Sequence, residues 1–256
     1  MSQEESQNEG ALTKSSSPGT RSSTSASMES AADPALTEDV ALGLLKTRDL
    51  PSEAVEQINK NAAVMKSPKV RRALAAHPRT PRRIALRLIR ELYTFDLMQF
   101  SLMPAPAADL KRVADELLVA RLASITLGER ISLARRSSAL VAAALLLDKE
   151  APVWQTALEN PRLTEAAIAR ALQRPNATAA FVEAVCHHAK WSLRPEIRIA
   201  LLRNEKTPLA RALEFARRLS PPHLRDILHN SRLPGRTKAY LKKDLESRRQ
   251  SGKASS

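Results

Sequence analysis

VRRALAAHPRTP, at residues 70–81, has three counterparts that share its register. They are VWQTALENPRLT at 153–164, IRIALLRNEKTP at 197–208 and HLRDILHNSRLP at 223–234. In each, an apolar helical pattern ends at an Asn or His, and a Pro or Thr follows four residues later. We call this Asn or His the closing residue, and the four are His77, Asn160, Asn204 and Asn230. Repeats of about 20 to 50 residues made of short helices are typical of solenoids, in which each unit stacks on its neighbours.

The recurrence has a physical basis in helix geometry. The positions two, three and seven before the closing residue are apolar in nearly every copy and lie on one helix face. Asn tolerates the left-handed backbone conformation that often ends helices. Thr80-Pro81 and Thr207-Pro208 would each supply a side-chain oxygen cap followed by proline at the first helical position. One helix is therefore expected to end and the next to begin within about four residues.

Composition also favours helices. The chain has 256 residues, 43% of them hydrophobic, which is enough for one large or two ordinary domains. Only 6 glycines and a 3% aromatic content leave little material for sheets and their turns. The copies are unevenly spaced: the distance from Asn160 to Asn204 is 44 residues, and that from Asn204 to Asn230 is 26. The sequence predicts an all-α fold, a degenerate helical-repeat solenoid of the α-α superhelix type.

The chain divides into three parts by composition. Residues 1–36 are Ser-rich and acidic with few large apolar side chains, so we expect a disordered tail. Residues 37–249 would form the helical repeat domain, and 250–256 a disordered end. Thr37 and Ser52 are expected helix caps, and Thr126 with Glu129 forms a capping box. Further helices are expected at about 106–122, 139–148, 152–160, 164–174, 178–189, 194–203, 208–219, 221–229 and 235–249.

Charge is unevenly distributed along the chain. Residues 1–40 hold seven acids and two bases, which leaves 39 bases and 20 acids in residues 41–256. The bases gather in an acid-free segment and at the C-terminus, between 236 and 253. The acid-free segment contains Lys66, Lys69, Arg71, Arg72, Arg79, Arg82, Arg83, Arg87 and Arg90. We take these nine residues as the candidate site for an anionic partner. They would neutralise phosphates of a nucleic acid, or they would keep a repeat protein soluble and contact acidic proteins.

Candidate catalytic or metal-binding chemistry is sparse. Cys186, His187 and His188 are adjacent, so on a helix they point to different faces and do not converge on one metal ion. We expect a buried cysteine with surface histidines. Trp154 is expected to pack between units. Most of the aromatic and Met side chains of residues 93–105 are expected to belong to the core for the same reason. That irregular segment would also suit an insertion that binds a ligand or partner. The sequence predicts no catalytic residues, no metal and no cofactor.

The units at 70–89 and 197–215 resemble the bacterial leucine-rich repeat variant, in which a short helix, Asn-Pro-x-Thr-Pro and a second helix follow one another; the wider similarity is to HEAT-like repeats. The hallmark is altered here, as His77-Pro-Arg-Thr-Pro81 and Asn204-Glu-Lys-Thr-Pro208 show. The resemblance implies a right-handed superhelical stack used as a binding surface, without catalytic residues. Some members of that family carry an iron–sulfur cluster on a cysteine-rich segment, a property that does not transfer to a chain with one cysteine.

These observations favour a non-enzymatic scaffold that binds a macromolecule, namely a protein, through an extended helical face. The alternative is a nucleic-acid-binding solenoid that contacts phosphates through residues 66–90 and 236–253. The longest apolar run, Ala139–Leu147, is far shorter than the roughly 20 residues needed to span a bilayer. We therefore expect a cytoplasmic protein without a membrane span. Neither the oligomeric state nor the partner's identity follows from the residues.

Overall fold

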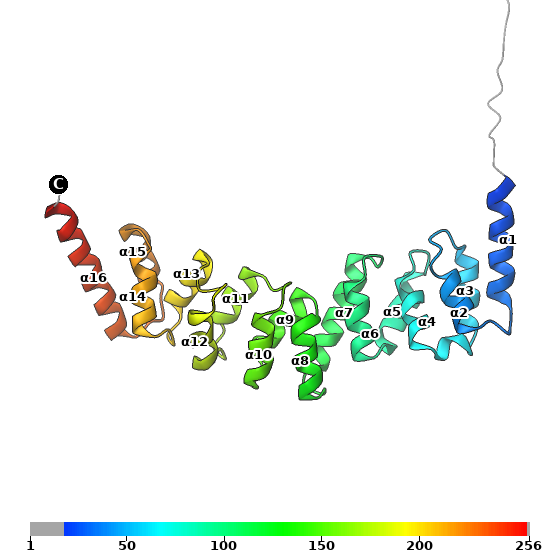
Figure 1. Ribbon diagram of the computed structural model, residues 1–256, viewed down its shortest axis with the longest axis horizontal. Helices are drawn as coiled ribbons and strands as arrows, with labels where there is room; N and C mark the ends of the chain where they lie inside the picture. The colour runs from blue at the N-terminus through cyan, green and yellow to red at the C-terminus, as the bar shows by residue number, and fades with distance from the viewer. Residues whose placement is uncertain (1–17, 255–256) are drawn as a thin grey trace, which may run out of the picture. The chain divides into compact units, whose positions relative to one another are not determined.

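The computed structural model describes residues 18–254, and the side chains of residues 25–248 within them. Over that range the chain is all-helical, with 16 α-helices, one short 3-10 helix and no strand (Figure 1). The helices fall into two compact units, which we describe separately. Unit 1 contains the described residues up to Leu92 together with Ala105–Ala107, and unit 2 contains Tyr93–Pro104 and the described residues from Ala108 onward. The all-α prediction is confirmed.

Unit 1 is built from five α-helices and the 3-10 helix. They are α1 (Pro18–Ala32), α2 (Glu38–Leu44), α3 (Ser52–Lys60), η1 (Val64–Lys66), α4 (Pro68–Ala76) and α5 (Arg82–Glu91). Helix α1 packs on α3, and α4 packs on both α2 and α5. Val70, Leu74 and Leu88 are fully buried between them.

Unit 2 holds the remaining helices, α6 to α16. They are α6 (Thr94–Leu102), α7 (Ala108–Arg121), α8 (Leu127–Arg136), α9 (Ala139–Leu145), α10 (Ala151–Leu158), α11 (Glu165–Leu172), α12 (Ala179–His187), α13 (Pro195–Arg203), α14 (Leu209–Arg217), α15 (Pro221–His229) and α16 (Gly235–Ala254). The helices from α9 to α15 lie close to the ranges that the sequence predicts, because Pro, Thr and Ser residues mark most of their starts.

Alternate helices of unit 2 pack on one another in two rows. Helices α8, α10 and α12 succeed one another in the first row, and α9, α11, α13 and α15 in the second (Figure 1). The apolar positions of the shared register lie between them: Val153, Ile197 and Leu201 are all fully buried. Trp154 is 5% exposed and meets Phe181 of α12 edge-on, with ring centroids 5.8 Å apart, so it packs between helices as expected.

The two ends of the chain are more helical than expected. Of the tail predicted to be disordered, residues 1–17 lie outside the described residues, but Pro18–Ala32 forms α1. Ala31 is buried, and the backbone carbonyl of Asp33 accepts a hydrogen bond from the Asn61 side chain. The buried side chain, Ala31, is small, so a search for large apolar side chains does not reveal this contact. Residues 250–254 likewise continue α16 rather than forming a disordered end.

Helix starts follow the predicted caps at Thr37 and Thr126 and differ at three others, and Thr164 caps α11 without having been predicted as a cap. The side chains of Thr37 and Thr164 accept hydrogen bonds from the backbone N–H three residues on, and Thr126 does so within a complete capping box with Glu129. Hydrogen bonds from the Thr126 N–H and hydroxyl lower the pKa of Glu129. Ser52, by contrast, is the first residue of α3, and the cap position belongs to a proline.

Thr80 and Thr207 act in the opposite direction from the one predicted. Each donates its hydroxyl backward to the preceding helix, to the carbonyl of Leu74 at 2.5 Å and of Leu201 at 2.6 Å. They therefore satisfy C-terminal carbonyls of one helix instead of N–H groups of the next. Pro81 and Pro208 occupy the cap positions of α5 and α14 without a side-chain hydrogen bond.

The segment at 93–105 is a helix rather than an irregular insertion. Helix α6 covers Thr94–Leu102 and packs on α7. Phe100 is fully buried and Met98 is 6% exposed, whereas Tyr93 is 65% exposed. The expectation that its aromatic and Met side chains are mostly core is thus correct for Met98 and Phe100 and wrong for Tyr93 and for Phe95, which is 36% exposed.

Candidate functional site

The closing residues bridge successive helices through their side chains. Asn160, 1% exposed after α10, donates from Nδ2 to the carbonyl of Ala134 at 2.8 Å and of Ser137 at 3.3 Å, both at the end of α8. Its Oδ1 accepts from the N–H of Arg162 at 2.8 Å. One amide thus satisfies two carbonyls at the end of α8 and one N–H in the turn after α10. This explains why a side chain with both a donor and an acceptor occupies the position.

The same bridge occurs at other closing residues. Asn204 donates to the carbonyl of Leu172 at the end of α11 and accepts from the N–H of Lys206 at 2.8 Å. His77, in unit 1, places Nε2 3.0 Å from the carbonyl of Thr47 and accepts at Nδ1 from the N–H of Arg79 at 3.2 Å. An imidazole with its proton on Nε2 therefore makes the same donor and acceptor contacts as the Asn amide.

This geometry corrects the left-handed helix end expected from the sequence. The backbone of His77 is extended, with φ −71° and ψ 133°, and that of Asn204 has φ −92° and ψ 131°. Asn230, the fourth closing residue, has φ −96° and ψ 9°, is exposed and makes no bridge to another helix. There the backbone makes the link instead, because the N–H of Arg232 donates to the carbonyl of Arg203 at 3.0 Å.

A fifth closing residue, His188, was not identified from the sequence. Its Nδ1 accepts from the N–H of Lys190 at 3.2 Å, and its Nε2 lies 3.1 Å from a carboxylate oxygen of Glu159, next to the end of α10. Trp191 joins the same helix end by donating from Nε1 to the carbonyl of Leu158 at 2.8 Å. The signal was present, since all five closing residues are followed two positions later by Arg or Lys. Only the Pro or Thr at the fourth position is missing after His188.

Several basic side chains satisfy backbone carbonyls at helix ends and in turns. Arg162 donates to Arg136, the last residue of α8, at 3.3 Å, and Lys206 donates to Ala177 in the turn before α12. Arg198 donates to Ser192 in the turn before α13, and Lys238 to Ser231 just after α15. Cations near helix C-termini are favourable because they complement the helix dipole. Part of the basic excess is therefore structural.

Helices α9 and α11 border an open groove on the second row. Its volume is about 310 Å³. Small apolar side chains form its floor, with Ala143 and Ala144 on α9 and Ala167 and Ala171 on α11. The remaining lining residues are Leu147, Arg170, Arg174 and Asn176. The groove thus combines an apolar floor with a basic margin, and small alanines leave the space that a larger side chain would fill.

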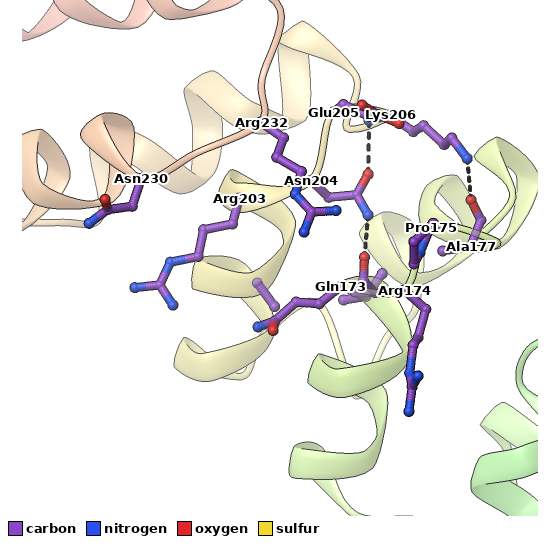
Figure 2. Close-up of a pocket in the computed structure, with 12 residues that line it drawn as sticks. Gln173, Arg174, Pro175, Ala177, Arg203, Asn204, Glu205, Lys206, Asn230 and Arg232 are labelled. Carbon is purple, nitrogen blue, oxygen red and sulfur yellow. Dashed lines mark hydrogen bonds between the residues drawn. The ribbon is translucent and has the colours of Figure 1, made fainter.

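A second, smaller pocket of about 150 Å³ lies beside the ends of α11, α13 and α15 (Figure 2). Arg174 lines both this pocket and the groove, so the two features adjoin. Three further cations, Arg203, Lys206 and Arg232, line the pocket, and Glu205 is its one acidic lining residue. We call it the basic pocket. Figure 2 shows the Asn204 bridge crossing its wall toward α11.

The nine basic residues predicted as an anion site all belong to unit 1. Lys66 ends η1, Lys69, Arg71 and Arg72 lie on α4, Arg79 lies in the following turn, and the other four lie on α5. Arg82, Arg83, Arg87 and Arg90 are exposed on α5, opposite its buried face. Lys69 lies 3.5 Å from Glu38, and Arg87 donates to the Asn59 side chain at 2.9 Å. Their role in binding stays a prediction.

The C-terminal bases lie on α16 in unit 2, and several contact neighbouring residues. Arg248 pairs with Asp244 at 3.2 Å, and Asp244 also pairs with Arg217 of α14. These contacts hold α16 against α14. This part of the second predicted basic region therefore contributes to packing.

Cys186 is fully buried, as predicted, and desolvation raises the pKa of its thiol to about 11. A thiol of that pKa is almost entirely protonated at neutral pH and is a poor nucleophile or metal ligand. His187 is exposed, but His188 is part of a bridge and not a surface residue. Among the described residues, no three His, Cys, Asp or Glu side chains come together in a way that would hold a metal ion.

Within the described range, no helix combines the length and the apolar character needed to cross a membrane. Comparison with protein-family models, with curated proteins and with solved structures finds no match for this chain. The resemblance to the leucine-rich repeat variant therefore stays a prediction that depends on the quoted motifs.

Proposed function

We propose that this chain is a helical-repeat scaffold of the solenoid type, related in design to HEAT-like repeats, and that it binds a segment of a partner protein without catalysing a reaction. The α9–α11 groove is the observation that carries this proposal. Its partner segment would place small or medium apolar side chains on the alanine floor and acidic side chains toward Arg170 and Arg174.

The bridges support the repeat architecture. They join residues 30 positions apart at His77, 26 at Asn160 and 32 at Asn204. These separations are similar to one another and correspond to one pair of short helices. A chain that satisfies the same backbone groups in the same way at such intervals behaves as a stack of comparable units, each completed by its neighbour.

The groove favours a protein segment over a rigid duplex as the ligand. An apolar floor of about 310 Å³ is suited to side chains that bury apolar surface. Nucleic acid contributes mainly phosphates at such a surface, and bases would need aromatic platforms for stacking. The residues that line the groove include no aromatic side chain.

A matched pair of substitutions tests the proposal. Peptides that bind the full chain would first be selected from a displayed random library. Ala144→Gln places a bulky amide on the groove floor, and Ala166→Gln makes the same change at an exposed position of α11. We expect Ala144→Gln to weaken binding of the selected peptides about fivefold or more, because the amide fills the floor or must be desolvated. Equal affinities for the two variants would place the binding site elsewhere and contradict the proposal.

Nucleic-acid binding is the second candidate, and the four exposed arginines on the outer face of α5 favour it. Phosphate contacts would make such binding strongly salt-dependent. Reversing Arg82, Arg83 and Arg87 to Glu should then abolish binding of a labelled DNA duplex or RNA strand at low salt. Undiminished binding by this variant would eliminate the α5 face as a nucleic-acid site.

A further inference from the structure

The basic pocket is lined by four cationic side chains and one acidic side chain. The N–H of Arg232 donates to the carbonyl of Arg203 at 3.0 Å, which fixes the two backbones side by side. Arg174 follows the end of α11 and lines the same pocket. In Figure 2 the Arg232 side chain points toward the ends of α11 and α13. The lining thus carries a net positive charge, which favours an anionic ligand.

The protein itself does not neutralise these arginines. Among the described residues, Arg174, Arg203 and Arg232 form no ion pair with a carboxylate. Glu205 contributes one negative charge to the lining, against four positive charges. Lys206 is already engaged, because its Nζ donates to the carbonyl of Ala177. The three arginines are also exposed to solvent. Their guanidinium groups are therefore accessible to an external anion.

We propose that the basic pocket binds acidic side chains, Asp or Glu, of the partner segment whose apolar side chains occupy the α9–α11 groove. This inference rests on the proposed function and specifies the partner's charge. Arg174 belongs to both features, so a segment that leaves the groove past Arg174 enters the pocket. Arginine presents a planar fork of N–H donors that matches a carboxylate in two-point contact.

The lining favours carboxylates of a peptide over a nucleic acid. A volume of about 150 Å³ accommodates one or two carboxylate groups. The side chains of Gln173 and Asn230 add neutral amide donors beside the arginines. No aromatic side chain lines the pocket, so it offers no surface on which a base would stack.

The test uses fluorescein-labelled octaglutamate, with octaglutamine and octathymidylate for comparison, against the full chain. The pocket variant is Arg203→Gln/Arg232→Gln. The matched control is Arg135→Gln/Arg136→Gln, which removes two charges from exposed arginines in the last turn of α8, in the other row. We expect the pocket variant to weaken octaglutamate binding about fivefold or more, and the control less than about twofold.

Two results would overturn the inference. One is equal weakening by the pocket and control variants, which would mean that octaglutamate responds to overall charge. The other is a pocket-dependent preference for octathymidylate over octaglutamate, which would make the pocket a nucleic-acid site. The two probes separate the two proposals, because Ala144→Gln is tested with the selected peptides and the pocket variant with octaglutamate. If Ala144→Gln does not weaken binding of the selected peptides while the pocket variant still weakens octaglutamate binding, only the proposed function is contradicted. If Ala144→Gln weakens peptide binding while the pocket variant leaves octaglutamate binding unchanged, only this inference is contradicted.

Discussion

At the scale of single residues, identical positions in the sequence register have different physical roles. Asn160 is buried and satisfies three backbone groups, whereas Asn230 is exposed and interacts with the adjacent His229 side chain. The local sequence is similar at both positions, so the difference comes from the helix that lies opposite. The sequence could thus identify the closing residues but not which of them bridge.

This difference makes a direct prediction for stability. Asn160→Ala should lower the free energy of unfolding by about 2–3 kcal/mol, because it leaves buried carbonyls without a donor. Asn230→Ala should change it by no more than about 0.5 kcal/mol, as is usual for surface substitutions. Chemical denaturation of both variants measures the contrast. Similar losses would show that the bridge at Asn160 does not stabilise the fold.

Asp115 of α7 is a buried carboxyl group of unit 2 that should make the free energy of unfolding depend on pH. It is 8% exposed, and burial raises its pKa, although hydrogen bonds to Ser138 and Ser101 lower it in part. A carboxyl group whose pKa is higher in the folded state binds its proton more tightly there. Its contribution to stability is therefore greatest below the unfolded-state pKa of about 4 and is lost as the pH rises through the folded-state pKa.

We accordingly expect Asp115→Asn to be more stable than the original chain at pH 7, with a difference that shrinks as the pH falls toward 4. Asp226→Asn, at an exposed position of α15, is the control and should show no such trend. Thermal unfolding from pH 4 to 8 measures both. A gain for Asp115→Asn that is independent of pH would mean that desolvation of the carboxylate is not its cause.

At the scale of helices, junction chemistry made most of unit 2 predictable. Pro, Thr and Ser residues at the junctions, together with apolar periodicity, placed α9 to α15 close to their observed bounds. The same reasoning missed α1, because its buried side chain, Ala31, is small. It also reversed the role of Thr80 and Thr207, whose hydroxyls donate to the preceding helix. A hydroxyl is both donor and acceptor, and the sequence does not tell which is used.

The buried face assigned to α13 can be checked by comparing two leucine substitutions. Leu201 lies in α13 and is fully buried, so Leu201→Ala should destabilise the chain by roughly 2–5 kcal/mol through lost burial and the cavity left behind. Leu193 precedes the same helix and is 61% exposed, so Leu193→Ala should have an effect within about 0.5 kcal/mol. Denaturant unfolding of both distinguishes them, and a near-neutral Leu201→Ala would contradict the assigned register.

At the scale of the whole chain, the basic excess has more than one origin. Arg162, Arg198 and Lys238 donate to backbone carbonyls at helix ends and in turns, while the α5 face and the basic pocket present arginines to solvent. The sequence shows only the sum of these charges. The groove and the pocket were not predictable because helices that are separated in the sequence contribute to them; Arg203, for example, lies 29 residues from both Arg174 and Arg232.

The central claim is that the second row of unit 2 forms the binding face. Hydrogen exchange of the full chain with and without a selected peptide tests it most directly. We predict slower exchange confined to α9, α11 and the turns after α11 and α13, with α8, α10 and α12 unchanged. Protection concentrated on α5, α16 or the first row, with none along α9 and α11, would contradict the account.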